Sequence, residues 1–545
     1  MPRPSLIPYT APARGGNGRS FSALPVELDT RQIIRSFDAA SLEWEQFRSL
    51  HMEIYDYAIP NRQLFINDSP GARKTDKVFN SAAVKATQRL AGRLQQTIVP
   101  AFQTWVRLVP GNLVPTEHVN EVGKFLDHQT DVLFEFINAS NFATAIHESL
   151  LDLTIGTGAL LVQDGGLETP LEYHSVPIFE LRPLEGPSGT IETVFRLRKP
   201  KLGNLLQIWP QATLPPELEQ KIEARPNETV EIIEGVVHRP FFRDYVYVVL
   251  HRGAAGSEHA SVMLATQMDL SPFIVFRWSK LAGETWGRGP LFDVLGDVRT
   301  CNELVRFTFQ NAQMAIAPPI LSTEAGIVNP ATFLYNPGGI NYVGEMEGVN
   351  TLKHDYRFDV SNLFVEKLEE SIRKGMFVDE LPPPEGGIRS ATEIMIRQRN
   401  LAEEIGAAFG RLQSELLVKM VNKSIRILQH HGKMEPFVID GRAVDVRFVG
   451  PLAQSQERED VLAFAQFWEI AQSVNPQIAM LGVKVEDAIE YLGEKFDIPR
   501  RLLREESERK ELEAMAAQAV MGPPGGAAAP AGLPGPTPSA LPTRR

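Results

Sequence analysis

The sequence has very little cysteine: Cys301 is the one thiol among its 545 residues. A single cysteine cannot form an intrachain disulfide, so the fold must be held together by packing, as in proteins of reducing compartments. Reactive thiols need a partly exposed, electropositive setting, whereas Cys301 falls on the apolar face of a predicted helix. We therefore expect a buried and chemically inert cysteine.

Long apolar runs are also missing. No stretch approaches the roughly 18 apolar residues that would span a bilayer, so we expect no contact with a membrane. Residues 1–29 contain prolines, glycines and serines but no apolar core segment, which is not the pattern of a signal peptide. This segment is expected to be a flexible N-terminal arm.

The chain lacks an excess of basic residues. Its 67 acidic side chains outnumber 55 basic ones, for a formal net charge of −12. Proteins that read DNA sequence usually carry a basic face that neutralises phosphates, so the balance argues against that class. The length and the hydrophobic share of 43% indicate a globular chain of two to four sub-domains.

Signatures of catalysis and of cofactor binding are missing too. There is no G-x-x-x-x-G-K-[ST] loop, no H-E-x-x-H or C-x-x-C metal motif, and no G-x-S-x-G nucleophile turn. The stretch GTGALL at residues 156–161 lacks a third glycine and leads into a strand, so we interpret it as a helix-to-strand turn. We expect no enzyme, and no catalytic residue, cofactor or metal ion.

Two pairs of titratable residues admit a second interpretation. His430 and His431 close a long predicted helix, where donors satisfy the last carbonyls. A metal site is the alternative, but adjacent side chains diverge and no carboxylate partner is evident.

Asp379 and Glu380 lie in a proline- and glycine-rich loop. We interpret them as solvated carboxylates, the alternatives being an acid/base pair or the lining of an acidic pore.

Tryptophans could stack on nucleotide bases, but a stacking platform needs interleaved lysine and arginine. Only Arg277 and Arg288 accompany the candidates, so we expect core or subunit-interface aromatics at Trp105, Trp278 and Trp286.

The spacing of apolar residues predicts an α+β fold in which helices dominate. Three- and four-residue spacing predicts helices over most of residues 30–155. Shorter runs rich in β-branched and aromatic residues, with a hairpin signal at Asp164-Gly165, predict a β-rich layer from there to Trp278.

A long amphipathic helix is predicted between Gly289-Pro290 and Pro318-Pro319. Its other face carries Asp293, Asp297 and Thr300. A helix occupied on both faces, without accompanying chemistry, indicates that the second face packs on or lines something outside the monomer. The apolar stripe comprises Leu291, Val294, Leu295, Val298, Cys301, Val305, Phe309 and Ala312.

A still longer helix is predicted over residues 391–431. It begins at a capping box formed by Ser390 and Glu393 and ends at Gly432. About 40 residues is far above the mean helix length of about 11–12. The loop 378–390 precedes it and contains Asp379, Glu380, Glu385 and Arg389.

Taken in order, five blocks of the chain resemble the portal proteins of tailed phages, in particular the head-to-tail connector proteins of short-tailed phages. The family's tryptophan-containing helix that ends in proline is matched by SLEWEQFRSLHMEIYDYAIPNR. Its alanine-rich helix with Leu-Ala-Gly, Pro and Trp is matched by NSAAVKATQRLAGRLQQTIVPAFQTWVRL. Its Arg-Trp, Gly-Glu and Gly-Arg-x-Pro positions are matched by FRWSKLAGETWGRGPLFDVLGDVRTCNEL, followed by APPIL, and its Thr-Glu block by RSATEIMIRQRNLAEEIGAAFGRLQSELL.

The resemblance, which runs from about residue 35 to 430, implies a mainly helical α+β portal fold that assembles into a ring, usually of twelve subunits. The implied regions are a wing (30–285), a stem helix (286–315), a clip (316–358), a second stem helix (359–377), a tunnel loop (378–390), a wing spine helix with strands (391–450) and a crown (451–515). Composition alone predicts a disordered Pro-, Gly- and Ala-rich tail over 516–545.

The function that the resemblance implies is a conduit at one capsid vertex, through which double-stranded DNA is packaged and ejected. The implied partners are further copies of the chain, the major capsid protein, the scaffolding protein, the large terminase subunit, and head-tail adaptor or tail proteins. The implied location is the head–tail junction of the virion, after assembly in the host cytoplasm.

Like charge along a DNA channel would prevent adhesion that stalls translocation. The expected channel residues are therefore Asp293, Asp297, Asp379, Glu380 and Glu385, with Arg389 as a possible phosphate contact. A different virion ring, such as a head-tail adaptor or tail-tube component, is the alternative function, and a hydrolase with paired carboxylates is a third.

Overall fold

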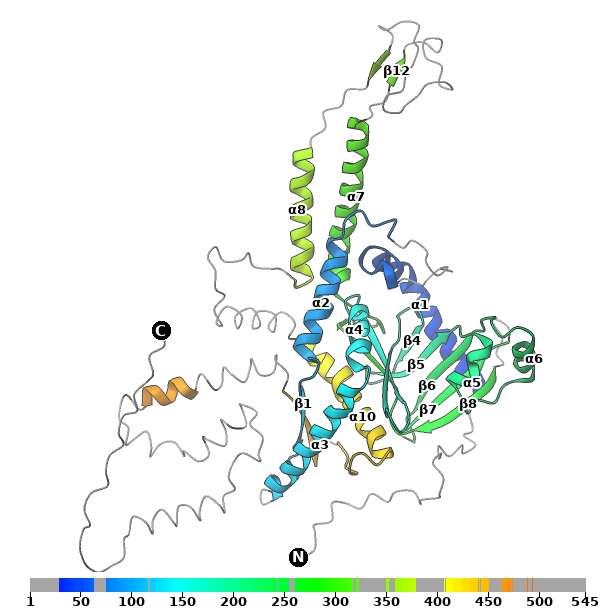
Figure 1. Ribbon diagram of the computed structural model, residues 1–545, viewed down its shortest axis with the longest axis vertical. Helices are drawn as coiled ribbons and strands as arrows, with labels where there is room; N and C mark the ends of the chain where they lie inside the picture. The colour runs from blue at the N-terminus through cyan, green and yellow to red at the C-terminus, as the bar shows by residue number, and fades with distance from the viewer. Residues whose placement is uncertain are drawn as a thin grey trace, which may run out of the picture.

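Two long helices, α7 (Pro290–Ile316) and α8 (Phe358–Gly375), project side by side from a body of shorter helices and antiparallel sheets (Figure 1). The computed structural model of the chain describes residues 29–62, 75–115, 118–242, 244–253, 260–316, 320–322, 349–351, 358–378, 406, 408–439, 441, 443–449, 461, 464–471, 473, 488 and 493.

Four helices form the N-terminal part of the body, as the apolar spacing predicts. The first begins at Asp29, whose carboxylate accepts hydrogen bonds from the backbone N–H groups of Arg31 and Gln32, and it ends just before Pro60. These helices are α1 (Thr30–Ala58), α2 (Ala82–Ile98), α3 (Val119–Ala139) and α4 (Phe142–Leu153).

The β-rich layer is also confirmed, as two antiparallel sheets. One has the order β3-β2-β9, and its β2–β3 hairpin opens at the predicted Asp164-Gly165. The other has the order β4-β5-β6-β7-β8. The strands are β2 (Thr157–Asp164), β3 (Leu171–Ser175), β4 (Leu181–Glu185), β5 (Ile191–Arg198), β6 (Ile232–Arg239), β7 (Asp244–His251), β8 (Ser261–Met268) and β9 (Phe273–Arg277).

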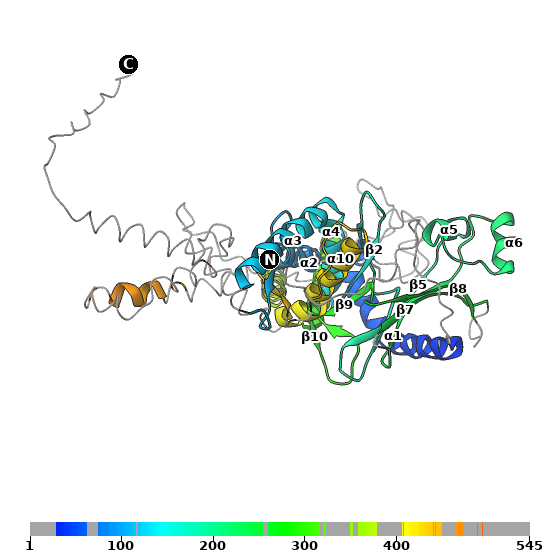
Figure 2. The same cartoon turned by 90° about the horizontal axis from the view of Figure 1, so that it is seen from below.

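The five-stranded sheet is covered on both faces. Helix α1 lies along one face, while α5 (Leu205–Ile208) and α6 (Pro216–Ala224) cover the other (Figure 2). Alternate residues of β7 serve the two faces: Val246 and Val248 join the cluster of α1, and Tyr247 accepts a hydrogen bond from Trp209 Nε1 at 2.9 Å. Both faces of this sheet are therefore covered by other parts of the same chain.

Segments far apart in sequence close the rest of the body. Strand β1 (Val106–Pro110) pairs with β14 (Val444–Phe448), so the body needs residues from both sides of the projecting helices. Beyond those helices, β12 (Ile320–Ser322) pairs with β13 (Val349–Thr351) within the predicted clip.

The spine helix is described only in its C-terminal part. Residues 408–412 are helical, Gln413–Leu417 form a π-helical segment, and α10 (Val418–His430) follows. Gly432 has a φ of 66°, which confirms the prediction that the helix ends at this glycine. The sequence pattern does not predict the π segment. The capping box lies outside the described residues, as do the arm, the tunnel loop beyond residue 378, most of the clip and crown, and the tail.

His51 is buried among aromatic rings where α1 meets the start of α7. Its ring lies 5.2 Å from that of Trp286 and 6.1 Å from that of Phe292, both edge-on, and its Nδ1 has no hydrogen-bond partner among the described residues. Burial lowers the pKa of His51 from 6.5 to about 3. The folded chain therefore holds this imidazole neutral.

We predict that His51 contributes to acid sensitivity. The unfolded chain binds the proton below pH 6.5 and the folded chain does not, so the unfolding free energy falls as the pH drops from about 6.5 towards 3. Between pH 7 and pH 5 the loss attributable to His51 is about 2 kcal/mol. Urea unfolding of a His51→Leu variant should show a decrease smaller by that amount.

The exposed His128 of α3 provides a control for the loss of one histidine, as His128→Gln. Parallel pH dependences for wild type and His51→Leu would contradict the prediction.

Candidate functional site

The projecting helices join the body at residues 277–302, which we call the stem base. Two short strands, β10 (Ser279–Lys280) and β11 (Gly287–Arg288), pair there before α7 begins. Their backbone lies directly on the turn between α4 and β2: a Cβ placed on Gly287 would sit 2.3 Å from the carbonyl oxygen of Gly156. Gly156 has a φ of 150° and is equally crowded. The turn interpretation of GTGALL is thus confirmed.

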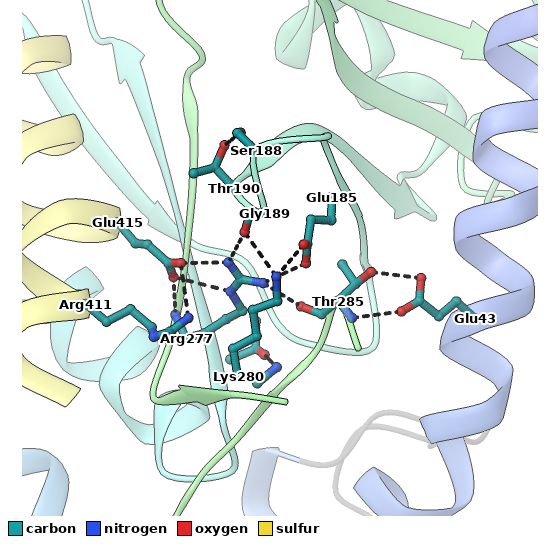
Figure 3. Close-up of polar contacts among 12 residues, drawn as sticks. Glu43, Glu185, Ser188, Gly189, Thr190, Arg277, Lys280, Thr285, Arg411 and Glu415 are labelled. Atoms are coloured by element: carbon teal, nitrogen blue, oxygen red, sulfur yellow. Dashed lines mark hydrogen bonds and ion pairs between the residues drawn. The ribbon is translucent and has the colours of Figure 1, made fainter. Parts of the chain in front are cut away.

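Arg277, the last residue of β9, is completely buried beneath the stem base (Figure 3). Its Nη2 donates to Glu415 Oε1 at 2.7 Å, and its backbone N–H donates to Glu415 Oε2 at 2.9 Å. Its Nη1 donates to Glu185 Oε2 at 3.2 Å and to the carbonyl of Thr285 at 3.3 Å. Nη2 also donates to the carbonyl of Gly189 at 3.0 Å. Its Nε donates to Glu415 Oε2 at 3.4 Å, so every N–H group of the guanidinium has an acceptor.

Further polar contacts extend from this residue. Lys280 Nζ also binds Glu185, and together Lys280 and Arg277 outweigh the effect of burial and hold the pKa of that carboxyl below its ordinary value. Glu43 of α1 accepts from the backbone N–H and the hydroxyl of Thr285, at 3.1 and 3.0 Å. We call these six residues the stem-base network: Glu43, Glu185, Arg277, Lys280, Thr285 and Glu415.

The network joins α1, the end of β4, β9, the β10–β11 turn and the spine helix. Removing one partner of a buried, hydrogen-bonded ion pair typically costs about 3–5 kcal/mol, because the remaining charge is left unpaired. The stem base is therefore fixed to several elements at once, and a change in any of them acts on the direction in which α7 leaves the body.

Asn302 makes a second connection, between α7 and the start of α2. Its Oδ1 accepts from the backbone N–H of Phe79 at 2.7 Å, and its Nδ2 donates to the carbonyl of Lys77 at 2.9 Å. Asn80 in turn accepts from the N–H of Ala82 and donates to Glu369 of α8 at 2.8 Å. Both projecting helices are thereby held at the N-terminus of α2.

The two projecting helices touch closely at their base. A Cβ on Gly375 would lie 2.3 Å from Val294 Cγ1, so any larger residue would displace this valine side chain. Ser371 Oγ donates to Asp297 Oδ2 at 2.6 Å. The chain leaving α8 is held by Arg93, which donates to the carbonyl of Phe377, and by the Trp278 ring stacked 5.9 Å from that of Phe377.

The six residues predicted to line a channel are only partly described. Asp293 is exposed on α7, whereas Asp297 is half-buried and bonded to α8 of its own chain. Asp379, Glu380, Glu385 and Arg389 lie outside the described residues.

Other predictions can be compared directly. Cys301 is buried, as predicted, and burial, with the nearby Glu369 and Asp297, raises its pKa to about 11, which disfavours the reactive thiolate. Trp105 and Trp286 are core residues as expected, while Trp278 is half-buried. The statement that the His430–His431 pair has no carboxylate partner is wrong, because His431 Nε2 lies 2.7 Å from Asp164 Oδ1, across 267 positions of sequence.

Within the described ranges, no group of three or more His, Cys, Asp and Glu residues could hold a metal ion. None of the helices placed in those ranges combines the length and apolar character that a membrane crossing requires.

Asn302→Ala should lower the unfolding free energy by roughly 1–3 kcal/mol, because two backbone N–H groups and one carbonyl lose their partner. Urea unfolding measures the change. Asn311→Ala, at an exposed position of the same helix, is the matched control and should have little effect. Equal stabilities for the two variants would rule out the proposed role of Asn302.

Comparison with known proteins shows which proteins this chain is similar to. The family model for the bacteriophage head to tail connecting protein matches residues 30–503. The "Portal protein" of Escherichia phage T7 is 22% identical over 499 residues, covering 87% of this chain and 88% of that protein. The "Probable portal protein" of Bordetella phage BPP-1 is 21% identical over 454 residues, covering 79% and 80%. The "Portal protein" of Enterobacteria phage T3 is 20% identical over 390 residues, covering 68% and 70%.

Among solved structures, a chain of the virion of a native gene transfer agent particle is similar with a TM-score of 0.31 and 11% identity, covering 71% of this chain and 85% of that one. A chain of the neck of the empty particle gives the same TM-score and identity, with coverage of 74% and 90%. These TM-scores are too low to place individual elements. The family match spans most of the sequence and confirms the resemblance inferred from the residues: the chain belongs to the bacteriophage head to tail connecting protein family.

Proposed function

We propose that this chain is the portal subunit of a tailed phage, and that identical copies form a ring at one capsid vertex through which double-stranded DNA passes. Family membership and three relatives named as portal proteins support this proposal. Those relatives match 68–87% of the chain, which favours a portal over a smaller adaptor or tail-tube ring.

The main structural support for a ring comes from the distal half of the projecting helices. Up to Asn302, the apolar stripe of α7 is buried against its own body. Beyond it, Phe309 and Ile316 continue the stripe but are exposed, and further large apolar side chains are exposed on the opposite side of α7 and on α8. We call six of these residues the stem belt: Phe307 (50% exposed), Phe309 (58%), Met314 (47%), Ile316 (85%), Leu363 (54%) and Phe364 (55%).

Exposed large apolar side chains concentrated in one part of a soluble protein mark an interaction site. Burying one phenylalanine side chain contributes about 1.5–3 kcal/mol, so a belt of six residues can drive association. In a ring of more than two copies, one face of each subunit meets a different face of the next subunit. Phe307 and Met314 lie on the side of α7 opposite to Phe309 and Ile316, so the stem belt offers two such faces. The stem belt is therefore the surface that we assign to contacts between neighbouring copies, and twelve copies is the number that the portal family suggests.

The regional roles are assigned from the family resemblance. The body is the wing, α7 and α8 are the stem, and the β12–β13 end is the clip that meets the large terminase subunit and later the head-tail adaptor or tail proteins (Figure 1). The wing and crown face the major capsid protein and the scaffolding protein. No catalytic step is assigned to the chain.

The channel lining is proposed at Asp293 and in the tunnel loop, at Asp379, Glu380, Glu385 and Arg389. Asp293 is exposed on α7, and a carboxylate there repels phosphates rather than binding them. Asp297 is the weaker candidate, because its carboxylate is bonded to Ser371.

Replacing Phe309 and Phe364 by serine should abolish rings, because each contact between copies loses two apolar side chains that are exposed in the single chain. Negative-stain images and light scattering report the assembly, and circular dichroism should show an unchanged fold. The matched control replaces Phe241 and Phe242, two exposed phenylalanines of the β6–β7 hairpin, by serine and should keep the rings. Intact rings in the stem variant would exclude the stem belt, and a monomeric wild type would exclude the ring.

Asp293→Lys should leave ring formation intact and reduce the DNA protected from nuclease inside capsids. A ring of lysines attracts phosphates and slows translocation. Higher ionic strength should partly restore packaging, since salt screens exposed charges over about 10 Å at 0.1 M. Asp293→Asn, which removes charge without reversing it, should package more DNA than the lysine variant. Normal packaging by Asp293→Lys would remove Asp293 from the channel lining.

A further inference from the structure

The spine helix changes its hydrogen-bond pattern at the residue that binds Arg277. Gln413–Leu417 is π-helical, and the N–H of Val418 donates to the carbonyl of Gln413, five residues back. An α-helix would use a partner four residues back, so the segment accommodates one extra residue. Such insertions are uncommon and are concentrated at functional positions.

The extra residue widens the inward face of the helix. Glu415, Leu416 and Leu417 are all buried, although three successive residues of a regular α-helix spread over most of its circumference. Leu412 and Met420 on either side are buried as well. The π geometry thus lets Glu415 reach Arg277 without withdrawing the apolar residues that hold the helix on the wing.

The contact acts on the main chain and not only on a side chain. Glu415 Oε2 accepts from the backbone N–H of Arg277, the residue at which β9 ends and the chain turns into the stem base. The next N–H along, that of Trp278, donates to the carbonyl of Gly156 at 2.8 Å. Movement of the spine helix at Glu415 therefore displaces the strand from which the stem starts.

A second cation already contacts the same carboxylate. Arg411 Nη1 lies 3.8 Å from Glu415 Oε1, and its side chain is one-third exposed. Residues four apart lie on the same side of a helix, although a basic residue before an acidic one is the less favourable order. If Glu415 turned fully to Arg411, Arg277 would keep only Glu185 and the two carbonyls.

We propose that Glu415 is a positioning residue that links the spine helix to the stem through Arg277, with the π segment setting its reach and Arg411 as the competing partner of its carboxylate. The inference rests on the proposed function in one respect, since it is the stem of a portal ring whose direction would be set. The contacts themselves all lie within one chain.

Hydrogen–deuterium exchange of the full-length protein tests the link. In Glu415→Gln, amides of residues 277–289 should exchange about tenfold faster than in wild type, while α3 and α4 stay unchanged. Arg277→Lys keeps the charge but cannot reach all the acceptors, and should act in the same direction. Arg411→Met should act in the opposite direction and slow exchange at 277–289, because the alternative state loses its partner.

The matched control is Glu370→Gln, which removes an exposed ion pair with Lys374 on α8 and should leave residues 277–289 unchanged. Unchanged exchange in Glu415→Gln, or a uniform increase over the whole chain, would overturn the proposal. So would an Arg411→Met variant identical to wild type. The exchange comparison can be made on single chains and does not require ring assembly. Failure of the wild type to assemble would therefore count against the portal function alone, and the exchange result would still test the role of Glu415.

Discussion

The burial of one cation, Arg277, is the constraint on which the arrangement of the stem depends. A guanidinium with no solvent contact must have every donor satisfied, and its acceptors come from the spine helix, from Glu185 and from the carbonyls of Gly189 and Thr285. These elements are separate in sequence, so the charge can be paired only when they have all assembled. The stem therefore takes its direction from a completed wing.

The apolar side chains of α7 form two groups, one buried in the single chain and one exposed. The proximal part of α7 is covered by α1, α2 and the base of α8, so its burial stabilises the single chain. The distal part exposes the stem belt, so its burial would stabilise an assembly. The boundary falls at Asn302, where a polar residue bound to the N-terminus of α2 marks the end of the wing contacts.

Local features were predictable from the sequence and long-range partners were not. The spacing of apolar residues predicted α1 to α4, α7 and the β-rich layer, because periodicity is a property of neighbouring residues. Arg277 and Asn302 lay in a block that resembled the family, yet nothing in one sequence pairs Arg277 with Glu415, 138 residues away, or His431 with Asp164. The π segment escaped prediction because a single inserted residue hardly changes an apolar spacing.

The stacking of Trp278 on Phe377 has an evolutionary consequence. The chain leaves the body after Trp278 and returns to it at Phe377. Because these two rings stack, the two ends of the segment 279–376 lie next to each other. Whole turns could be added to α7 and α8 in equal number, or the distal tip exchanged, without altering the geometry at the point of departure. The projecting segment could thus be remodelled while the body keeps its own packing.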